Sequence, residues 1–242
     1  MALRSTSKVF GIATTATAVG LLLGACAIGA GGPRETQERD VEGLADATGV
    51  ALETSGDLVV EIGDEPSLTV TARSREIDRL TSEVRDGVLV LGTTGDLWSD
   101  DDDVDYHLVL TALDVVRLGG SGDVEAGAAT GERLVLEVTG SGDVTVHEVE
   151  VDALQVGLEG SGDIELRGTA DHQVVTVTGS GSYDARGVRS RDAAVTLEGS
   201  GDVDVDVSDA LTVSLTGSGQ VTHTGGADVD SDVQGSGEVR EG

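Results

Sequence analysis

A short glycine-rich phrase returns seven times in the second half of the chain, and this repeat limits what the chain can fold into. The first glycines of the seven copies are Gly120, Gly140, Gly160, Gly179, Gly199, Gly217 and Gly235. Consecutive copies lie 18 to 20 residues apart. A unit repeated at near-constant spacing folds as a series of similar structural units that stack on their neighbours. The chain is therefore expected to form a solenoid.

The residues around each phrase alternate with a period of two, as in a β-strand. In the copy GSGDV that begins at Gly140, apolar residues lie four and two positions before the glycine, at Leu136 and Val138, and four positions after it, at Val144. These offsets are all even, and residues at even offsets share one face of a strand. Both glycines then share the apolar face, whereas the serine and the aspartate point to water. We expect the glycines to face an interior that bends too sharply for a side chain.

One phrase per coil gives coils of about 20 residues that stack as parallel strands. Crossovers between parallel strands are almost always right-handed. The expected fold over residues 48–242 is therefore all-β, a right-handed parallel β-helix or β-solenoid. The aromatic residues of the whole chain are Phe10, Trp98, Tyr106 and Tyr183. A thin interior filled by Val, Leu and Ile, which suit strands, explains why aromatic residues are so few.

The spacing of the phrase shortens from 20 to 18 residues while the apolar positions beside it stay fixed. The variation in length is therefore expected in three segments between the phrases: His147–Asp152, Val188–Arg191 and Val207–Leu211. Loops on a rigid scaffold commonly carry binding residues. Arg186, Arg189 and Arg191 gather at the second segment and are candidate ligand contacts. The alternative is that these arginines only neutralise neighbouring acidic residues.

The iterated phrase G-S-G-D-[VI] resembles the repeat of the autotransporter adhesin head GIN domain family, a domain of unknown function. Leu68–Arg73 and Val84–Val90 are similar to the opening strands of that family. The resemblance covers roughly residues 48–242 and implies a role in surface adhesion. Ser182, Gln220 and Glu238 stand where the family pattern has aspartate. These departures leave the glycine bend intact and weaken the view that the aspartate is required.

Residues 1–25 are expected to be a lipoprotein signal peptide. Arg4 and Lys8 accompany an apolar stretch over residues 9–23 that is short for a membrane span. The stretch ends in the residues Leu23–Cys26, which resemble the bacterial lipobox. Cys26, the only cysteine of the chain, would then carry the lipid, and residues 26–47 would form a flexible tether. The alternative is a chance cysteine in an ordinary signal peptide. We expect an exported protein that a lipid anchors to a membrane of the cell envelope.

The charge of the chain excludes one class of partner. The net charge is −30, and it becomes −32 once removal of residues 1–25 takes away Arg4 and Lys8. Such a surface repels nucleic acid and anionic lipid headgroups. We therefore expect no nucleic-acid partner, and attachment to a membrane would come from the lipid.

The aspartates of the phrase are the first candidates for a metal site. Asp123, Asp143 and Asp163 should stack above one another, and like charges opposite each other in a sheet are destabilising. A calcium ion would relieve that repulsion, although water and salt also screen an exposed row. The phrase itself does not match a dinucleotide site, because another strand and not a helix follows it. We expect no cofactor, with Ca²⁺ on the aspartate column as the alternative.

Trp98 beside the acidic segment of residues 100–105 is a candidate contact for a sugar or a protein. The alternative is that it covers one end of the solenoid. His107, His147, His172 and His223 lie on different coils without metal-ligand spacing. The expected function is a lipid-anchored, non-enzymatic surface protein for adhesion or envelope contact with surface glycans or proteins. The rival is a carbohydrate-binding or carbohydrate-cleaving β-helix protein.

Overall fold

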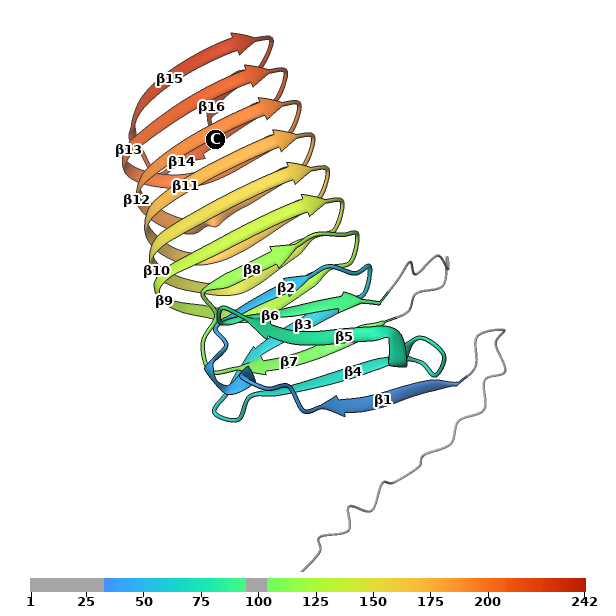
Figure 1. Cartoon of the computed structure of the whole chain (residues 1–242). Coiled ribbons are helices and arrows are strands. Elements are labelled where there is room, and N and C mark those ends of the chain that lie inside the picture. The colour runs from blue at the N-terminus through green and yellow to red at the C-terminus, as the bar shows by residue number, and fades with distance from the viewer. Residues whose placement is uncertain (1–32, 95–103) are drawn as a thin grey trace, which may run out of the picture.

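The computed structural model describes residues 33–94 and 104–242, which form a single β-solenoid (Figure 1). Its coils rise in a right-handed sense from the N-terminal strands to β15 and β16 at the far end. Two short 3-10 helices, η1 (Leu44–Asp46) and η2 (Ile77–Arg79), interrupt the strands. Within the described ranges, no helix is long and apolar enough to cross a membrane. The expected all-β fold with coils of about 20 residues is confirmed.

Long, bent strands make up the regular coils. They are β9 (Val124–Gly140), β10 (Val144–Gly160), β11 (Asp163–Gly179), β12 (Ser182–Gly199) and β13 (Asp202–Gly217). Neighbouring coils pair in parallel, and the first glycine of each phrase pairs with the first glycine of the next. Each coil has a first corner at the phrase and a second corner about halfway along its strand. The register therefore stacks equivalent residues of successive coils into columns.

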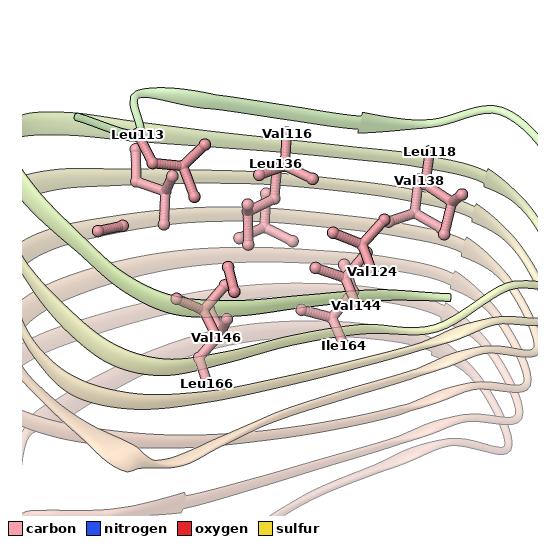
Figure 2. Packing of buried hydrophobic residues seen from close by; sticks show 14 of the residues in the cluster. Leu113, Val116, Leu118, Val124, Leu136, Val138, Val144, Val146, Ile164 and Leu166 are labelled. Atoms are coloured by element: carbon pink, nitrogen blue, oxygen red, sulfur yellow. The ribbon is translucent and has the colours of Figure 1, made fainter. Parts of the chain in front are cut away.

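Columns of aliphatic side chains fill the interior (Figure 2). Val124, Val144 and Ile164 form one such column, as the ladder pairs of β9, β10 and β11 require. All three are at most 1% exposed, and the leucine and valine columns before the phrase are at most 2% exposed as far as Val213 and Leu215. The even offsets of the sequence thus identified the inner face correctly.

The glycines of the phrase are required for a reason that differs from the expected one. A Cβ on Gly142 would lie 2.0 Å from the carbonyl oxygen of Gly122, and one on Gly140 would lie 2.2 Å from that of Gly120. Both distances are far below van der Waals contact. Gly140 also has a φ of +136°, a conformation that glycine adopts without strain. The side chain is therefore excluded mainly by the backbone of the preceding corner along the solenoid axis, and less by a narrow interior.

The N-terminal coils are shorter and irregular. Their strands are β1 (Arg34–Arg39), β2 (Gly49–Leu52), β3 (Asp57–Ile62), β4 (Ser67–Arg73), β5 (Leu80–Arg85), β6 (Val88–Thr93), β7 (Asp105–Leu110) and β8 (Val115–Leu118). β2 and β8 extend one wall, whereas β3 and β7 extend the other in parallel. β4 then pairs antiparallel with β7, and β5 pairs antiparallel with β6. Antiparallel strands thus close this end of the solenoid.

Part of the predicted tether belongs to the folded structure. β1 pairs with β4 along its whole length, from Arg34 opposite Arg73 to Arg39 opposite Leu68. Leu44 in η1 is 6% exposed and packs in the core. The sequence predicted a flexible segment over residues 26–47, but from Arg34 onward the structure shows paired strand and buried side chain.

Three short strands complete the C-terminal end. They are β14 (Gln220–Thr224), β15 (Asp228–Gly235) and β16 (Glu238–Glu241). β15 continues the wall of β13, and β16 lies on β14 in the other wall. No further coil covers them among the described residues.

Two glycine-to-alanine substitutions distinguish the effect of a clash between stacked corners from the effect that any glycine-to-alanine change has on the entropy of the unfolded chain. Gly142→Ala is expected to lower the free energy of unfolding by about 1–3 kcal/mol, because the new methyl group meets a carbonyl oxygen in a closely packed corner. A Cβ on Gly157 in β10 would meet nothing within 4 Å, so Gly157→Ala should be neutral or stabilising by up to about 1 kcal/mol. Chemical denaturation of both variants measures the difference. Equal losses would contradict the stacking explanation.

Candidate functional site

A groove of about 820 Å³ crosses the second corners of the coils. Its lining residues are Thr130, Gly131, Glu150, Val151, Asp152, Thr169, Ala170, Asp171, Arg189, Ser190, Arg191, Asp206, Ser208 and Gly225. They come from six successive coils, so the groove runs along the solenoid axis. Four carboxylates, two guanidinium groups and several hydroxyl groups are among the lining groups.

The groove lies where the sequence predicted variation in coil length. The β10–β11 ladder shifts register between Val146 and Val149 of β10. The β12–β13 ladder shifts between Ala185 and Arg189 and again between Ser190 and Asp192 of β12. These irregularities fall within or beside the predicted segments His147–Asp152 and Val188–Arg191, while the phrase corners keep their register. The second corner is thus the part of each coil that varies.

One ladder column supplies half of the polar side chains that line the groove. In order along the axis, the column contains Thr130, Glu150, Thr169, Arg189 and Asp206. Neighbouring coils are roughly 4.8 Å apart. A ligand lying along the groove would therefore meet acidic, hydroxyl, basic and acidic groups in succession.

The three candidate arginines have different surroundings. Arg186 lies outside the groove and binds both carboxylate oxygens of Asp184, with its Nε 3.0 Å from Asp184 Oδ1. This hydrogen bonding holds the pKa of Asp184 below its ordinary value. Arg191 lines the groove and places a terminal nitrogen 3.1 Å from Asp171 Oδ2. For these two, the structure shows neutralisation of neighbouring acids.

Arg189 is in a different position, because its guanidinium has no hydrogen-bond or ion-pair partner among the residues that the structure describes. It is exposed and points from the second corner of β12. In a protein with 45 acidic and 15 basic residues, an unpaired arginine inside a groove is available to an anionic group of a ligand.

A buried polar network supports the groove wall from inside. The Tyr183 hydroxyl donates to Gln173 Oε1 at 2.8 Å, and Gln173 Nε2 donates to Ser190 Oγ at 2.8 Å. Ser190 Oγ in turn donates to the carbonyl oxygen of Asp206 at 2.9 Å. Burial raises the pKa of the Tyr183 phenol well above its ordinary value. Because each group has its partner, the network holds the corners of β12 and β13 next to Arg189 without unsatisfied polar atoms.

The aspartate column has a structural role at the corners. Asp123 Oδ1 accepts the backbone N–H of Asp143 at 3.0 Å, and Asp143 Oδ1 accepts that of Asp163 at 2.8 Å. The series continues from Asp163 to the N–H of Ser182 at 3.0 Å. One oxygen of each carboxylate is therefore used to bind the next coil. In residues 33–94 and 104–242, no group of three or more His, Cys, Asp or Glu side chains is placed to hold a metal ion.

The remaining candidates are dispersed or undescribed. Three of the histidines each lie beside one carboxylate: His107 by Glu61 at 3.4 Å, His147 by Glu125 at 2.7 Å and His172 by Asp192 at 3.1 Å. They belong to different coils, as the sequence suggested. Trp98 and Cys26 lie outside the described residues.

Comparison with known proteins identifies the family. The family model described as "Putative auto-transporter adhesin, head GIN domain" matches residues 46–227. The chain belongs to this family. The resemblance that the repeated phrase suggested is thereby confirmed, and the match begins close to the predicted start of the domain.

Solved structures share the fold of this GIN-domain protein. A putative adhesin from Bacteroides fragilis has a TM-score of 0.77 at 18% identity, covering 86% of this chain and 97% of its own. A putative lipid binding protein from Parabacteroides distasonis has a TM-score of 0.68 at 24% identity, covering 87% and 97%. A putative adhesin from Parabacteroides merdae has a TM-score of 0.66 at 20% identity, again covering 87% and 97%. No curated protein sequence matches the chain.

Two substitutions of Asp143 distinguish its hydrogen bond from its charge. Asp143→Asn keeps a side-chain oxygen for the N–H of Asp163 and removes a like charge from the column, so stability should change by less than about 0.5 kcal/mol. Asp143→Ala removes the acceptor and should cost about 0.5–1.5 kcal/mol. Thermal and denaturant unfolding compare the two. A loss in the asparagine variant as large as in the alanine variant would show that the negative charge itself is needed.

Proposed function

We propose that this GIN-domain protein is a lipid-anchored, non-enzymatic surface protein that makes adhesive contacts through the groove at the second corners. The observation that carries the proposal is the unpaired Arg189 within that groove, which has no partner among the described residues. Membership of a family described as adhesin head domains supports the adhesive role. The partner would be a surface glycan or protein that presents an anionic group.

The surroundings of Arg189 explain how such contacts would be selective. An arginine binds a carboxylate, sulfate or phosphate through two parallel hydrogen bonds. The carboxylates of Glu150 and Asp206 in the same column would repel a uniformly anionic polymer and accept hydroxyl or ammonium groups of the ligand. A partner with isolated anionic groups among hydroxyl or amino groups therefore fits the groove best.

The anchor in this proposal is the lipid on Cys26. The basic residues, the apolar stretch and the residues Leu23–Cys26 stand in the order of a lipoprotein signal. The acidic domain would not bind an anionic membrane by itself, since the chain carries a net charge of −30. Lipid attachment would hold the solenoid at the envelope and leave its groove accessible.

The groove also motivates a second candidate function, a carbohydrate-cleaving activity. Glu150, Asp152, Asp171 and Asp206 line the same groove, and glycoside hydrolysis uses a pair of carboxylates. Asp171 is bound to Arg191, which leaves three carboxylates for such a pair. Incubation with polysaccharides and an assay for new reducing ends distinguishes the candidates. Binding without new reducing ends supports the adhesive function.

Arginine substitutions in displayed protein test the contact site. Arg189→Ala is expected to lower adherence of cells that display the protein by about tenfold or more, as loss of a charge-assisted hydrogen bond of about 1.5–3 kcal/mol implies. Its melting temperature should stay unchanged, because Arg189 has no partner to lose among the described residues. Adherence is measured on immobilised surface glycans and surface proteins.

Two variants serve as controls in the same assay. Arg133 also has no side-chain partner in the described part of the chain, and it does not line the groove, so Arg133→Ala should adhere normally. Cys26→Ser should move the protein from the membrane fraction to the medium. Equal adherence of the Arg189 and Arg133 variants would contradict the groove as the contact site. Membrane retention of Cys26→Ser, together with a wild-type protein that carries no acyl mass, would contradict the lipid anchor.

A further inference from the structure

The two ends of the solenoid have different edge strands. At the N-terminal edge, the β1 residues that pair with buried Leu68, Val70 and Ala72 are Arg39, Gln37 and Glu35. Paired residues share a face of the sheet, so this edge strand turns polar and charged side chains toward the core side. Inward-facing charges on an edge strand prevent the pairing of another strand.

The C-terminal edge keeps two of the three inward apolar positions of an internal coil, and Ser231 takes the place of the middle valine. Val229 and Val233 of β15 continue the columns of Leu211 and Leu215, which are at most 1% exposed. Because no coil lies above them in the described structure, Val229 and Val233 are 39% and 40% exposed. Every residue of β15 is exposed, and β15 pairs only with β13 among the described strands. Figure 1 shows β15 as the outermost strand of its wall. This edge thus offers unpaired backbone groups together with apolar side chains.

The outer face of the same strand determines which partner fits. Along β15, the inward residues alternate with three aspartates that lie on the outer face. These are Asp228, Asp230 and Asp232, which pair with Ala210, Thr212 and Ser214 of β13. A second copy that paired through its own β15 would bring aspartates opposite aspartates, which is destabilising. A strand with lysine or arginine on its outer face would instead be attracted.

We propose that the C-terminal edge of the solenoid binds an extended segment of another protein in which apolar residues alternate with Lys or Arg. The segment adds one strand to β15, as in other cases of β-strand addition. Its backbone completes the ladder, its apolar residues cover Val229 and Val233, and its basic residues lie beside Asp228, Asp230 and Asp232. This site is separate from the groove, so its test is independent of the function proposed above.

The experiment uses fluorescent eight-residue peptides, matching the length of β15, and the full protein. A peptide of alternating Val and Lys is expected to bind, and one of alternating Val and Glu is not. A peptide with the same Val and Lys content in two blocks should bind at least tenfold more weakly, because it cannot put its apolar residues on one face. Fluorescence anisotropy measures affinity, and hydrogen exchange should show new protection confined to β15.

Variants of the protein locate the site. Val229→Lys/Val233→Lys imitates the inward charges of β1 and should reduce binding of the Val–Lys peptide at least tenfold. Val174→Lys, at a residue that is 53% exposed on a central coil, is the matched control and should bind as wild type does. Asp230→Lys/Asp232→Lys should reverse the preference toward the Val–Glu peptide.

Three outcomes would overturn the proposal. Equal binding of the alternating and block peptides would show only general attraction to an acidic protein. Absence of binding would show that the aspartates serve only to keep the edge unpaired. Concentration-dependent dimerisation of the wild type that Val229→Lys/Val233→Lys abolishes would identify a second copy as the occupant.

Discussion

The contact between a corner glycine and the carbonyl oxygen of the preceding corner determines the rest of this structure. In the regular coils, a Cβ on the first glycine of a phrase would lie 2.0–2.3 Å from the carbonyl oxygen of the first glycine of the preceding phrase. Only glycine allows this approach. This approach brings the backbones of successive corners into direct register. The backbone N–H of the serine in each phrase can then donate to a glycine carbonyl oxygen of the preceding coil, as Ser161 does to Gly140 at 2.9 Å. Apolar columns follow from that register, because equivalent residues of all coils then lie above one another.

The same register stacks like charges at the corners and places polar side chains in the core, and hydrogen bonds between neighbouring coils compensate for both. Stacked aspartates at the corners would repel one another, but each uses one oxygen to accept the N–H of the next coil. In the core, Tyr183 and Gln173 replace aliphatic residues, and a chain of hydrogen bonds through Ser190 satisfies them. The second corners are not held by glycine stacking of this kind throughout, so they vary in length. A groove forms there, and it contains Arg189, whose guanidinium has no hydrogen-bond or ion-pair partner among the described residues.

The sequence predicted those features that the repeat itself encodes. The period specified the coils, and the even offsets specified the inner face down to individual residues such as Val144 and Val138. The expected reason for the glycines was incomplete, because the sequence alone does not show which backbone atoms of the neighbouring coil lie next to each glycine. The pairing of β1 was also missed, since Arg34–Arg39 has no apolar alternation. At the groove, sequence reasoning grouped three arginines. The structure separates Arg189 from Arg186, which binds Asp184 two residues earlier in the same strand, and from Arg191, which binds Asp171 of the neighbouring coil. The polar network had one signal in the sequence, a tyrosine at Tyr183 where other coils have valine or isoleucine.

Native-state hydrogen exchange of the corner serines tests the central claim most directly. The side chains of Ser161, Ser180, Ser200 and Ser218 are exposed, yet their backbone N–H groups donate to glycine carbonyls of the preceding corners at 2.8–2.9 Å. If stacked corners hold the coils in register, these amides should exchange as slowly as those of the buried columns beside them, such as Val177 and Leu197. Exchange at the rate of an open surface loop would show that the corners are ordinary turns and that the register comes from the apolar columns alone.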